Sequence, residues 1–176
     1  MGAVRFTKVE SPVGELLLAA SDRGLTTLLF EVWGHGPADA ERSDWQQDDG
    51  TGRAGEILAE ARRQLAEYFA RKRTSFDLPL DLSGTPFQLQ VWNALTQIPF
   101  GSTLSYGALA RRVGSPNGSR AVGAANGRNP VAIVVPCHRV IGANGDLTGF
   151  GGGMARKEWL LQHEGGIPEA LFTQET

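Results

Sequence analysis

The stretch at residues 131–140 constrains the fold of this chain more than any other. It reads VAIVVPCHRV, and it holds the only cysteine of the 176 residues beside one of three histidines. β-Branched and apolar residues that stop at a proline predict a buried strand, or a tight extended segment, that ends abruptly. Cys137 would then follow a rigid element that can direct its side chain into a pocket.

Cys137 and the adjacent His138 permit two interpretations. A lone cysteine is most often a small buried hydrophobic residue, and on the pair alone this structural interpretation is the more common one. Alternatively, the neighbouring imidazole acts as a base, directly or through one water molecule, and forms the thiolate that is the nucleophile.

The residues around the pair favour the nucleophile. The motif PCHRVIG is preceded by Asn129-Pro130 and followed by LTGFGGG and RKEWLLQHE. These residues resemble the O6-alkylguanine-DNA alkyltransferases, single-turnover repair proteins that move an alkyl group from guanine in DNA to their own cysteine. The resemblance is nearly continuous over residues 84–165. Upstream of these residues, the arrangement of predicted elements is similar but the amino-acid sequence is not. It implies an α+β fold, with an N-terminal antiparallel sheet and helix in a ribonuclease H-like layout and a mostly helical C-terminal domain with a helix-turn-helix.

The composition limits which cellular compartment and which cofactors we expect for this protein. No run approaches the roughly 18 apolar residues that a membrane helix requires, and the charged, alternating N-terminus is unlike a signal peptide. One cysteine gives neither an internal disulfide nor a cysteine zinc cluster, which suits a reducing compartment. We therefore expect a cytoplasmic protein, associated with the nucleoid when it acts, with no metal and no cofactor.

Charge is divided unevenly along the chain. Residues 1–83 carry 10 basic and 14 acidic side chains, whereas residues 84–164 carry 7 basic and 3 acidic ones. This division favours an N-terminal α/β scaffold domain, residues 1–83, and a DNA-facing C-terminal domain, residues 84–176. We expect a monomer in solution without a membrane partner, and we leave cooperative binding to DNA open.

Turn and periodicity signals outline the N-terminal domain. They predict an antiparallel meander of three strands at 4–9, 14–20 and 25–30, followed by a polar surface loop at 34–52. A helix is predicted at 53–71, and residues 76–80 are a last strand or an extended linker. The apolar face of the helix is predicted from helical spacing at Ile57, Leu58, Ala61, Leu65 and Phe69.

Three helices are predicted between the domain boundary and the cysteine segment. Thr85 or Ser83 caps a helix that continues to Leu95, Ser105 caps a helix at 106–113, and Ser119 caps a helix at 120–126. The second and third helices, joined by a turn rich in Gly, Pro and Asn, form a helix-turn-helix.

The third helix has a smooth face of Ala and Gly after Arg120, without the side chains that read bases in the major groove. It is either a tightly packed internal helix or one that enters the minor groove and binds DNA without strong sequence preference. The resemblance implies the second, with Arg120 entering the base stack in place of the flipped nucleotide. The DNA-binding residues would be Ser119, Arg120, Ala121, Gly123, Ala124 and Arg128.

The resemblance also implies the catalytic residues. A Cys–water–His–Glu relay falls on Cys137, His138 and Glu164, Tyr106 donates a proton to the purine N3, and Asn129 is a hinge beside the cysteine segment. Glu164 ends an amphipathic helix that starts near Met154, and a carboxylate at a helix C-terminus requires a cationic partner. His163 is interpreted as solvent-facing or structural.

The substrate pocket is expected at Val140, Phe150 and Gly151. Phe150 stands where many relatives have tyrosine, and Ala132 stands where some relatives that accept bulky adducts have proline. The size of the adduct that this chain accepts is therefore left open.

The predicted function is irreversible, stoichiometric transfer of an alkyl group, above all methyl, to Cys137. The donor is O6-alkylguanine, and also O4-alkylthymine, in double-stranded DNA after base flipping. Two alternatives are a non-catalytic module that binds alkylated DNA and a turnover thiol hydrolase. The presence of Cys137 counts against the first, and the helix-turn-helix counts against the second.

Overall fold

A computed structural model describes residues 3–30, 42–143, 145 and 153–165. The chain divides into two compact units. The N-terminal unit comprises the residues up to Ser83 together with residues 130–134, and the C-terminal unit comprises residues 84–129 and those from Val135 onwards. Within the described ranges, no helix has the length and apolarity needed to cross a membrane.

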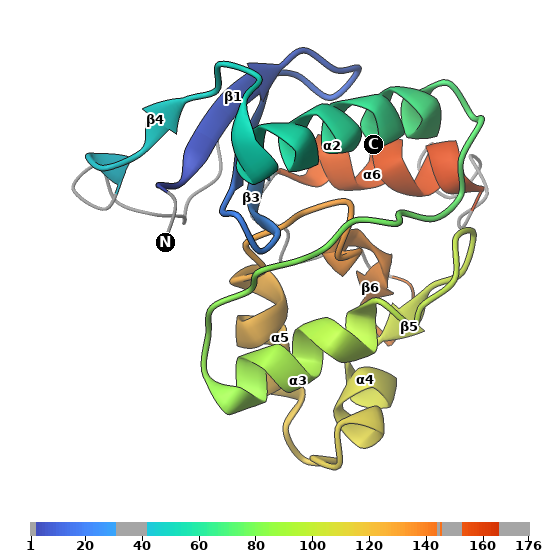
Figure 1. The fold of residues 1–176 in the computed structure, drawn as a ribbon. Coiled ribbons are helices and arrows are strands. Elements are labelled where there is room, and N and C mark those ends of the chain that lie inside the picture. Colours follow the sequence, from blue (N-terminus) through green and yellow to red (C-terminus); the bar gives the residue numbers. More distant parts are fainter. Residues whose placement is uncertain (1–2, 31–41, 144, 146–152, 166–176) are drawn as a thin grey trace. The chain divides into compact units, whose positions relative to one another are not determined.

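An antiparallel meander forms the centre of the N-terminal unit (Figure 1), as predicted. Its strands are β1 (Arg5–Val9), β2 (Leu16–Ala20) and β3 (Leu25–Phe30). The turn between β1 and β2 closes with a hydrogen bond from the Gly14 amide to the Ser11 carbonyl, 3.0 Å, and Gly14 has a φ of +100°, which glycine adopts without strain. β2 and β3 are almost entirely buried and supply most of the sheet's contribution to the core.

A fourth strand, β4 (Gln46–Gln47), extends the sheet and pairs in parallel with β1. The predicted loop at 34–52 is therefore wrong at these residues, whereas residues 31–41, including His35, lie outside the described residues. The pairing is carried by backbone hydrogen bonds from Gln46 to Val4 and from Asp48 to Phe6, each 2.9 Å. Both glutamine side chains are exposed, so the strand has no apolar alternation from which it can be predicted.

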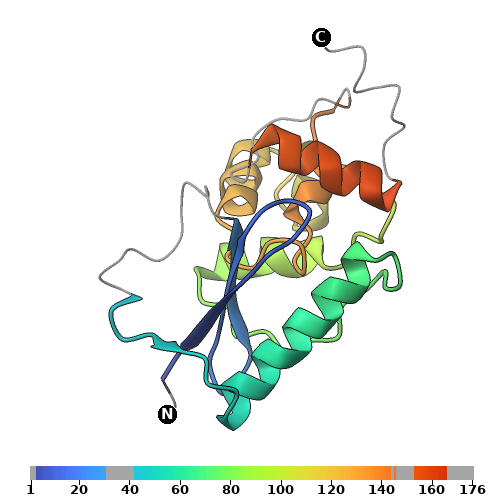
Figure 2. The ribbon, with the colours of Figure 1, turned by 90° about the horizontal axis from the view of Figure 1, so that it is seen from above.

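The helix α2 (Gly52–Phe69) packs along the sheet, as Figure 2 shows from above. Ile57, Leu58, Ala61 and Leu65 are buried as predicted. Tyr68, not Phe69, completes this face, because Tyr68 lies three residues after Leu65 and is fully buried, whereas Phe69 packs edge-on against its ring.

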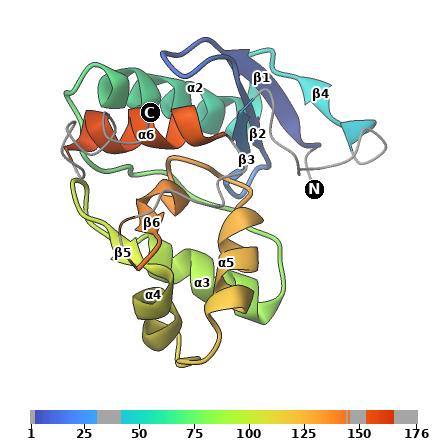
Figure 3. The same ribbon diagram turned by 180° about the vertical axis from the view of Figure 1, so that it is seen from behind.

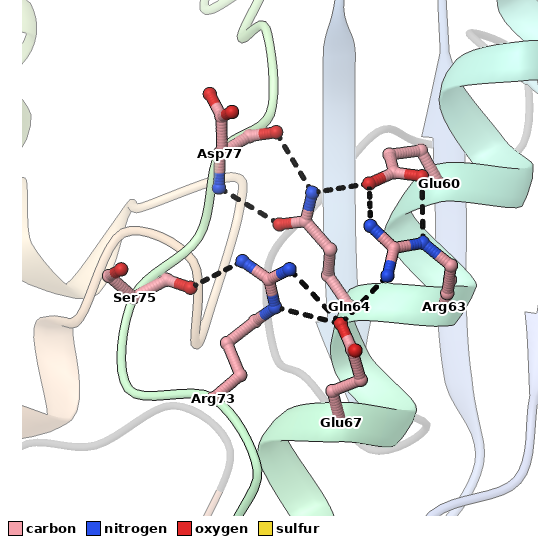
Figure 4. A network of polar contacts seen from close by, with 7 residues as sticks. All are labelled: Glu60, Arg63, Gln64, Glu67, Arg73, Ser75 and Asp77. Carbon is pink, nitrogen blue, oxygen red and sulfur yellow. Dashed lines mark hydrogen bonds and ion pairs between the residues drawn. The ribbon is translucent and has the colours of Figure 1, made fainter.

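Gln64 joins α2 to the segment that follows it (Figure 4). Its side-chain amide is buried and bonds both backbone groups of Asp77: the Asp77 amide donates to Oε1 and Nε2 donates to the Asp77 carbonyl, each at 2.9 Å. Nε2 also donates to Glu60, 2.8 Å. Around this amide, Arg63 and Arg73 form ion pairs with the helix carboxylates Glu60 and Glu67 at the surface.

We expect Gln64→Leu to destabilise the N-terminal unit by about 1–2 kcal/mol, because it leaves two backbone groups without their partner. The thermal midpoint should fall by roughly 2–8 °C. Arg63→Ala is the matched control, since Arg63 is exposed and its ion pairs are screened by solvent. Equal melting curves for Gln64→Leu and the wild type would show that water replaces the amide without loss.

The segment before Cys137 is buried, as predicted, but most of it is not a strand. Only Val131 forms a bridge, to Leu28, and the chain then turns. The Val134 amide bonds the Ala132 carbonyl and the Cys137 amide bonds the Val135 carbonyl, both at 2.8 Å, and Ile133 has a φ of +70°. A short apolar run indicates burial but does not distinguish a strand from a buried turn.

The C-terminal unit is mostly helical (Figure 3). Its elements are α3 (Pro86–Leu95), β5 (Leu104–Ser105), α4 (Tyr106–Arg112), α5 (Ser119–Gly127), the single 3-10 turn η1 (Cys137–Arg139), β6 (Val140–Ile141) and α6 (Met154–Glu164). The helices α3, α4 and α5 pack against one another, and α4 and α5 form the predicted helix-turn-helix.

The helix caps agree with the sequence in two cases and differ in one. Thr85 and Gln88 form a reciprocal capping box at α3, and the Ser105 hydroxyl accepts the Ala108 amide at α4. The predicted Ser119 cap of α5 is wrong, because Gly118 is the N-cap residue and Ser119 is the first residue of the helix. The Gly118 amide bonds the Ser115 carbonyl, and this turn moves the start of α5 back by one residue.

Candidate active site

Cys137 lies in the turn η1, close to the helices α4, α5 and α6 of the C-terminal unit. The parallel bridge between β5 and β6 sets Leu104 opposite Val140, so that Tyr106, at the start of α4, comes near the turn η1. The helix α5 ends just before Asn129, and α6 contacts η1 with its last turn. The Trp92 indole donates to the Ala125 carbonyl, 2.8 Å, and fixes the C-terminal end of α5 to α3.

His138 and Glu164 form a buried hydrogen-bonded pair. The imidazole Nε2 lies 2.8 Å from a Glu164 carboxylate oxygen, and the two side chains are 0% and 1% exposed. Burial lowers the pKa of His138, against the raising effect of Glu164, and the cations Arg139 and Lys157 lower it further. His138 is therefore neutral at pH 7. Since a carboxylate only accepts hydrogen bonds, the proton resides on Nε2, and Nδ1 carries the lone pair.

Nδ1 of His138 is buried and has no hydrogen-bond partner within the part of the chain that the structure describes. A buried basic nitrogen without a donor is uncommon. Its lone pair is available to take a proton, directly or through a water molecule, from a nearby acid.

Arg139 is the cation that Glu164 requires at the C-terminus of α6. Its guanidinium bonds both carboxylate oxygens, at 2.8 and 3.0 Å, and also donates to the Ile98 carbonyl at 2.6 Å. Burial alone would raise the pKa of Glu164, but the hydrogen bonds and charges of His138 and Arg139 lower it well below its usual range. Glu164 is therefore ionised, and its charge is balanced by Arg139.

Cys137 is 1% exposed and its thiol is protonated at rest. Burial raises its pKa to about 11, although a hydrogen bond from the Asn129 side chain and the charge of Lys157 act in the opposite direction. With that pKa, almost every molecule carries the protonated thiol at pH 7. A nucleophilic Cys137 must lose its proton to a base during the reaction.

Two asparagines at the end of α5 contact the cysteine segment. Asn129 is fully buried, and its side-chain amide donates to the Val135 carbonyl at 2.7 Å. Asn126 is also buried, and its Nδ2 lies 3.4 Å from the Cys137 carbonyl. Both bonds join the helix that bears Arg120 to the residues around the thiol.

Lys157 is a buried cation beside the thiol. It lies on α6, is fully buried, and donates from Nζ to the Val140 carbonyl at 2.6 Å. Burial lowers its pKa to about 8, against the raising effect of Cys137. Lys157 thus supplies positive charge close to the place where a thiolate would form.

The structure brings together five of the sequence-predicted residues: Tyr106, Asn129, Cys137, His138 and Glu164. Val140 is buried in β6, whereas Phe150 and Gly151 lie outside the described residues. His163 is buried and stacks on Trp159 with ring centroids 4.8 Å apart, so it is structural and not solvent-facing. Arg139, Lys157 and Asn126 were not predicted as site residues. The unfavourable helix-end position of Glu164 signals a cation, but does not identify Arg139.

The predicted DNA-binding residues lie along α5, from its first residue, Ser119, to its C-cap residue, Arg128. Ser119, Arg120, Ala121, Ala124 and Arg128 are exposed, and Gly123 is half-buried against the Tyr106 ring. Val122, Ala125 and Asn126 form the buried face of the helix. Of the seven basic residues in 84–164, Arg139 and Lys157 are buried, so the surface of this unit is less basic than its sequence indicates.

The fold and the site define a class of protein. Its members have a buried cysteine next to a neutral histidine, which is hydrogen-bonded to an ionised glutamate, in a unit with a helix-turn-helix. Known proteins match the chain over most of its length. Residues 86–166 match the family model described as 6-O-methylguanine DNA methyltransferase, DNA binding domain, and residues 4–82 match its ribonuclease-like domain.

Individual relatives agree with the family models. A methylated-DNA–protein-cysteine methyltransferase of Mycolicibacterium paratuberculosis is 48% identical over 92% of each chain, and one of Methanosarcina acetivorans is 50% identical over 89% of this chain and 95% of its own. The crystal structure of Mycobacterium tuberculosis OGT in complex with DNA matches with a TM-score of 0.83 and 48% identity, over 91% of this chain and 92% of the other.

The chain therefore belongs to the 6-O-methylguanine DNA methyltransferase family. This confirms the resemblance seen in the sequence and the predicted fold class, including the ribonuclease-like layout of the N-terminal part.

Proposed function

We propose that this protein repairs DNA by moving an alkyl group, above all methyl, from O6-alkylguanine to Cys137. One observation carries the proposal. Cys137 is a buried thiol beside a neutral His138, whose Nε2 is held by the ionised Glu164 and whose Nδ1 is without a partner in the described part of the chain. Such a pair can accept the thiol proton and hold it as an imidazolium.

The transfer is a single displacement. The Cys137 proton passes to His138 Nδ1, directly or through one water molecule, and the imidazolium is stabilised by Glu164. The thiolate attacks the alkyl carbon, an S–C bond forms, and the bond from that carbon to guanine O6 breaks. The electron pair moves into the purine, and Tyr106 donates a proton to N3 as the base leaves. No group restores the thiol, so each molecule acts once. O4-alkylthymine is a proposed second substrate.

DNA binding is assigned to the helix-turn-helix. The solved relative from M. tuberculosis is in complex with DNA, and the exposed Ala and Gly positions of α5 would let its backbone approach a minor groove. Double-stranded DNA is thus the proposed partner, and the proposed DNA-binding residues are those predicted from the sequence. An alkyl group on O6 within the duplex does not reach a buried thiol, so the base must be flipped out. We assign Arg120 to the gap that the base leaves.

We expect Arg120→Ala to slow repair of duplex DNA about tenfold or more, because base flipping costs a few kcal/mol and the inserted guanidinium offsets part of that cost. Reaction with the free base O6-benzylguanine, where no flipping occurs, should change little in the same variant. Arg112→Ala is a matched control, since Arg112 is exposed on α4, outside the proposed DNA-binding residues. Equal losses on the two substrates would mean that Arg120 only supports the helix.

The remaining assignments follow from the free thiol and from the division of the chain. Cys137 is a free cysteine, which suits a reducing cytoplasm. We assign the scaffold role to the predicted domain 1–83 and the chemistry to the predicted domain 84–176, in a protein that is monomeric in solution.

The proposal is tested by counting equivalents. Purified protein is mixed with duplex DNA containing O6-methylguanine, without added metal or cofactor, over a range of ratios. Repair should stop at one methyl group per protein molecule. Continued turnover would indicate a hydrolase, and binding without loss of methyl from the DNA would indicate a recognition module.

We also expect the methylated protein to be less stable than the unreacted one. Cys137 is 1% exposed, so an added methyl group must displace packed neighbours, at a cost of about 1–3 kcal/mol. About 1 kcal/mol corresponds to about 2–4 °C for a chain of this size. Melting curves of fully methylated and unreacted protein test this, and a benzyl adduct should melt lower still. An unchanged or raised midpoint would show that the site has room for the alkyl group.

A further inference from the structure

Ile133 has a backbone conformation that its residue type disfavours. Its φ is +70°, and among the described residues the only other non-glycine residue with a positive φ is Arg71. A positive φ brings Cβ close to the neighbouring carbonyl oxygen, and a β-branched side chain makes this clash worse. Ile133 is 1% exposed, so the freedom of a surface loop does not account for its conformation. The surrounding structure must hold it there.

The positive φ belongs to a three-residue turn. The Val134 amide donates to the Ala132 carbonyl at 2.8 Å, across Ile133. A turn of this size with a negative φ at its centre is common, whereas the form with a positive φ is rare and strained. Glycine adopts a positive φ without strain. The stability of the turn alone therefore does not explain an isoleucine at its centre.

Hydrogen bonds hold the chain on both sides of this turn. Before the turn, the Leu28 amide donates to the Pro130 carbonyl and the Leu28 carbonyl accepts the Ala132 amide, each at 2.9 Å. After the turn, the Val135 carbonyl accepts the Asn129 side chain at 2.7 Å. The strained residue thus lies between two held points, and it cannot relax to a negative φ without disturbing one of them.

A second turn connects the first to the nucleophile. Pro136 has a φ of −83° and a ψ of 66°, and the Cys137 amide donates across it to the Val135 carbonyl at 2.8 Å. These dihedral angles are those of the common form of the three-residue turn. Only Val134 and Val135 separate the centres of the two turns. Reversing the sign of φ at Ile133 would therefore redirect the chain that leads to Cys137.

We infer that Ile133 is a positioning residue for Cys137: its positive φ sets the direction of the chain towards the nucleophile, and its buried side chain holds that φ against relaxation. This inference rests on the proposed function, because it concerns the nucleophile of that reaction. A nucleophile must lie in line with the alkyl carbon, and a misplacement of about 1 Å can slow a reaction about a hundredfold. Disturbing Ile133 should therefore lower the transfer rate and leave DNA affinity unchanged.

The test compares two truncations at Ile133. Ile133→Gly and Ile133→Ala both remove the buried side chain, but only glycine adopts the positive φ without strain. We expect Ile133→Gly to melt about 2–4 °C above Ile133→Ala, which reverses the usual order of these two residues. With saturating duplex DNA containing O6-methylguanine, transfer should be about tenfold slower than wild type for the glycine variant and about a hundredfold slower for the alanine variant. DNA affinity, measured by a mobility shift, should be unchanged in both.

Val131 supplies the matched control. It is 0% exposed, and it is not among the residues with a positive φ. Val131→Ala and Val131→Gly also remove a buried side chain, but here the alanine variant should be the more stable of the two. Val131→Ala should transfer methyl from saturating DNA at close to the wild-type rate, because the turn at Ile133 is intact.

The same melting order at both positions, or transfer by Ile133→Ala at the wild-type rate, would overturn the inference. A measurement on the wild type covers the case in which neither variant of Ile133 folds. A positive φ brings the Ile133 amide proton close to its own Hα, so a strong nuclear Overhauser effect between the two is expected, and a weak one would also overturn the inference. Failure of the wild type to take methyl from the DNA would instead refute the proposed function, on which the melting order does not depend.

Discussion

Cys137→Ser is expected to lose methyl transfer by at least about a hundredfold while it still binds duplex DNA. A serine hydroxyl has the shape of the thiol but is a much harder and more basic nucleophile. The wild-type thiol is already difficult to ionise, since burial raises its pKa to about 11. His138 would have far more difficulty removing the proton from an alcohol in the same buried position than from the thiol. Transfer is measured as loss of methyl from O6-methylguanine DNA, and binding by a mobility shift.

Two controls separate chemistry from folding for this variant. The melting midpoint of Cys137→Ser should stay close to that of the wild type, because the replacement is nearly isosteric. DNA affinity should also be retained, since the exposed face of α5 is unchanged. Transfer by the serine variant at more than a few per cent of the wild-type rate would remove Cys137 from the mechanism.

Arg139→Met is expected to cause the largest loss of stability of any single change considered, about 3–5 kcal/mol. The carboxylate of Glu164 is 1% exposed, and without Arg139 it would remain buried with only a neutral imidazole as its partner. The substitution also removes the donor to the Ile98 carbonyl and the contact of the guanidinium with the Phe100 ring. Transfer should fall as well, because Glu164 would no longer be held in place to orient His138.

The double variant Arg139→Met, Glu164→Met distinguishes the two effects. Replacing both members of a buried ion pair by apolar residues is often neutral for stability, so the melting midpoint should recover most of the loss. Transfer should not recover, since His138 would then lack the carboxylate that fixes its tautomer. Recovery of both properties would show that Glu164 has no part in the chemistry. A melting midpoint for Arg139→Met equal to that of the wild type would contradict the assignment of Arg139 as the partner of Glu164.

The sequence predicts well the features that are local. Thr85 caps α3 because the residues Thr-Pro-Phe-Gln contain a complete capping box. Ser105 caps α4 through its hydroxyl alone, which accepts the Ala108 amide. The strands of the meander follow from short apolar runs bounded by turns. The motif at Cys137 and His138 indicates the family, and the comparisons with known proteins confirm this resemblance.

Features that depend on distant partners are not predictable in this way. β4 is held by backbone pairing to β1, which leaves no trace in side-chain periodicity. Arg139 is one of several arginines in the C-terminal half, and only the fold brings it to Glu164 rather than to the surface. The run before Cys137 is as apolar as a buried strand, yet it forms turns. One of its residues has a positive φ, and two short-range hydrogen bonds use backbone groups that a strand would need for pairing.

The most direct test of the account is the mass of the protein, intact and after digestion, following reaction with one equivalent of duplex DNA containing O6-methylguanine. Replacing one hydrogen by one methyl group adds about 14 Da by simple stoichiometry. We predict that this increase appears once per molecule, on the peptide that contains Cys137, and that unmodified duplex produces none. Unchanged mass after the methyl group has left the DNA, or a methyl group on any other residue, would contradict it.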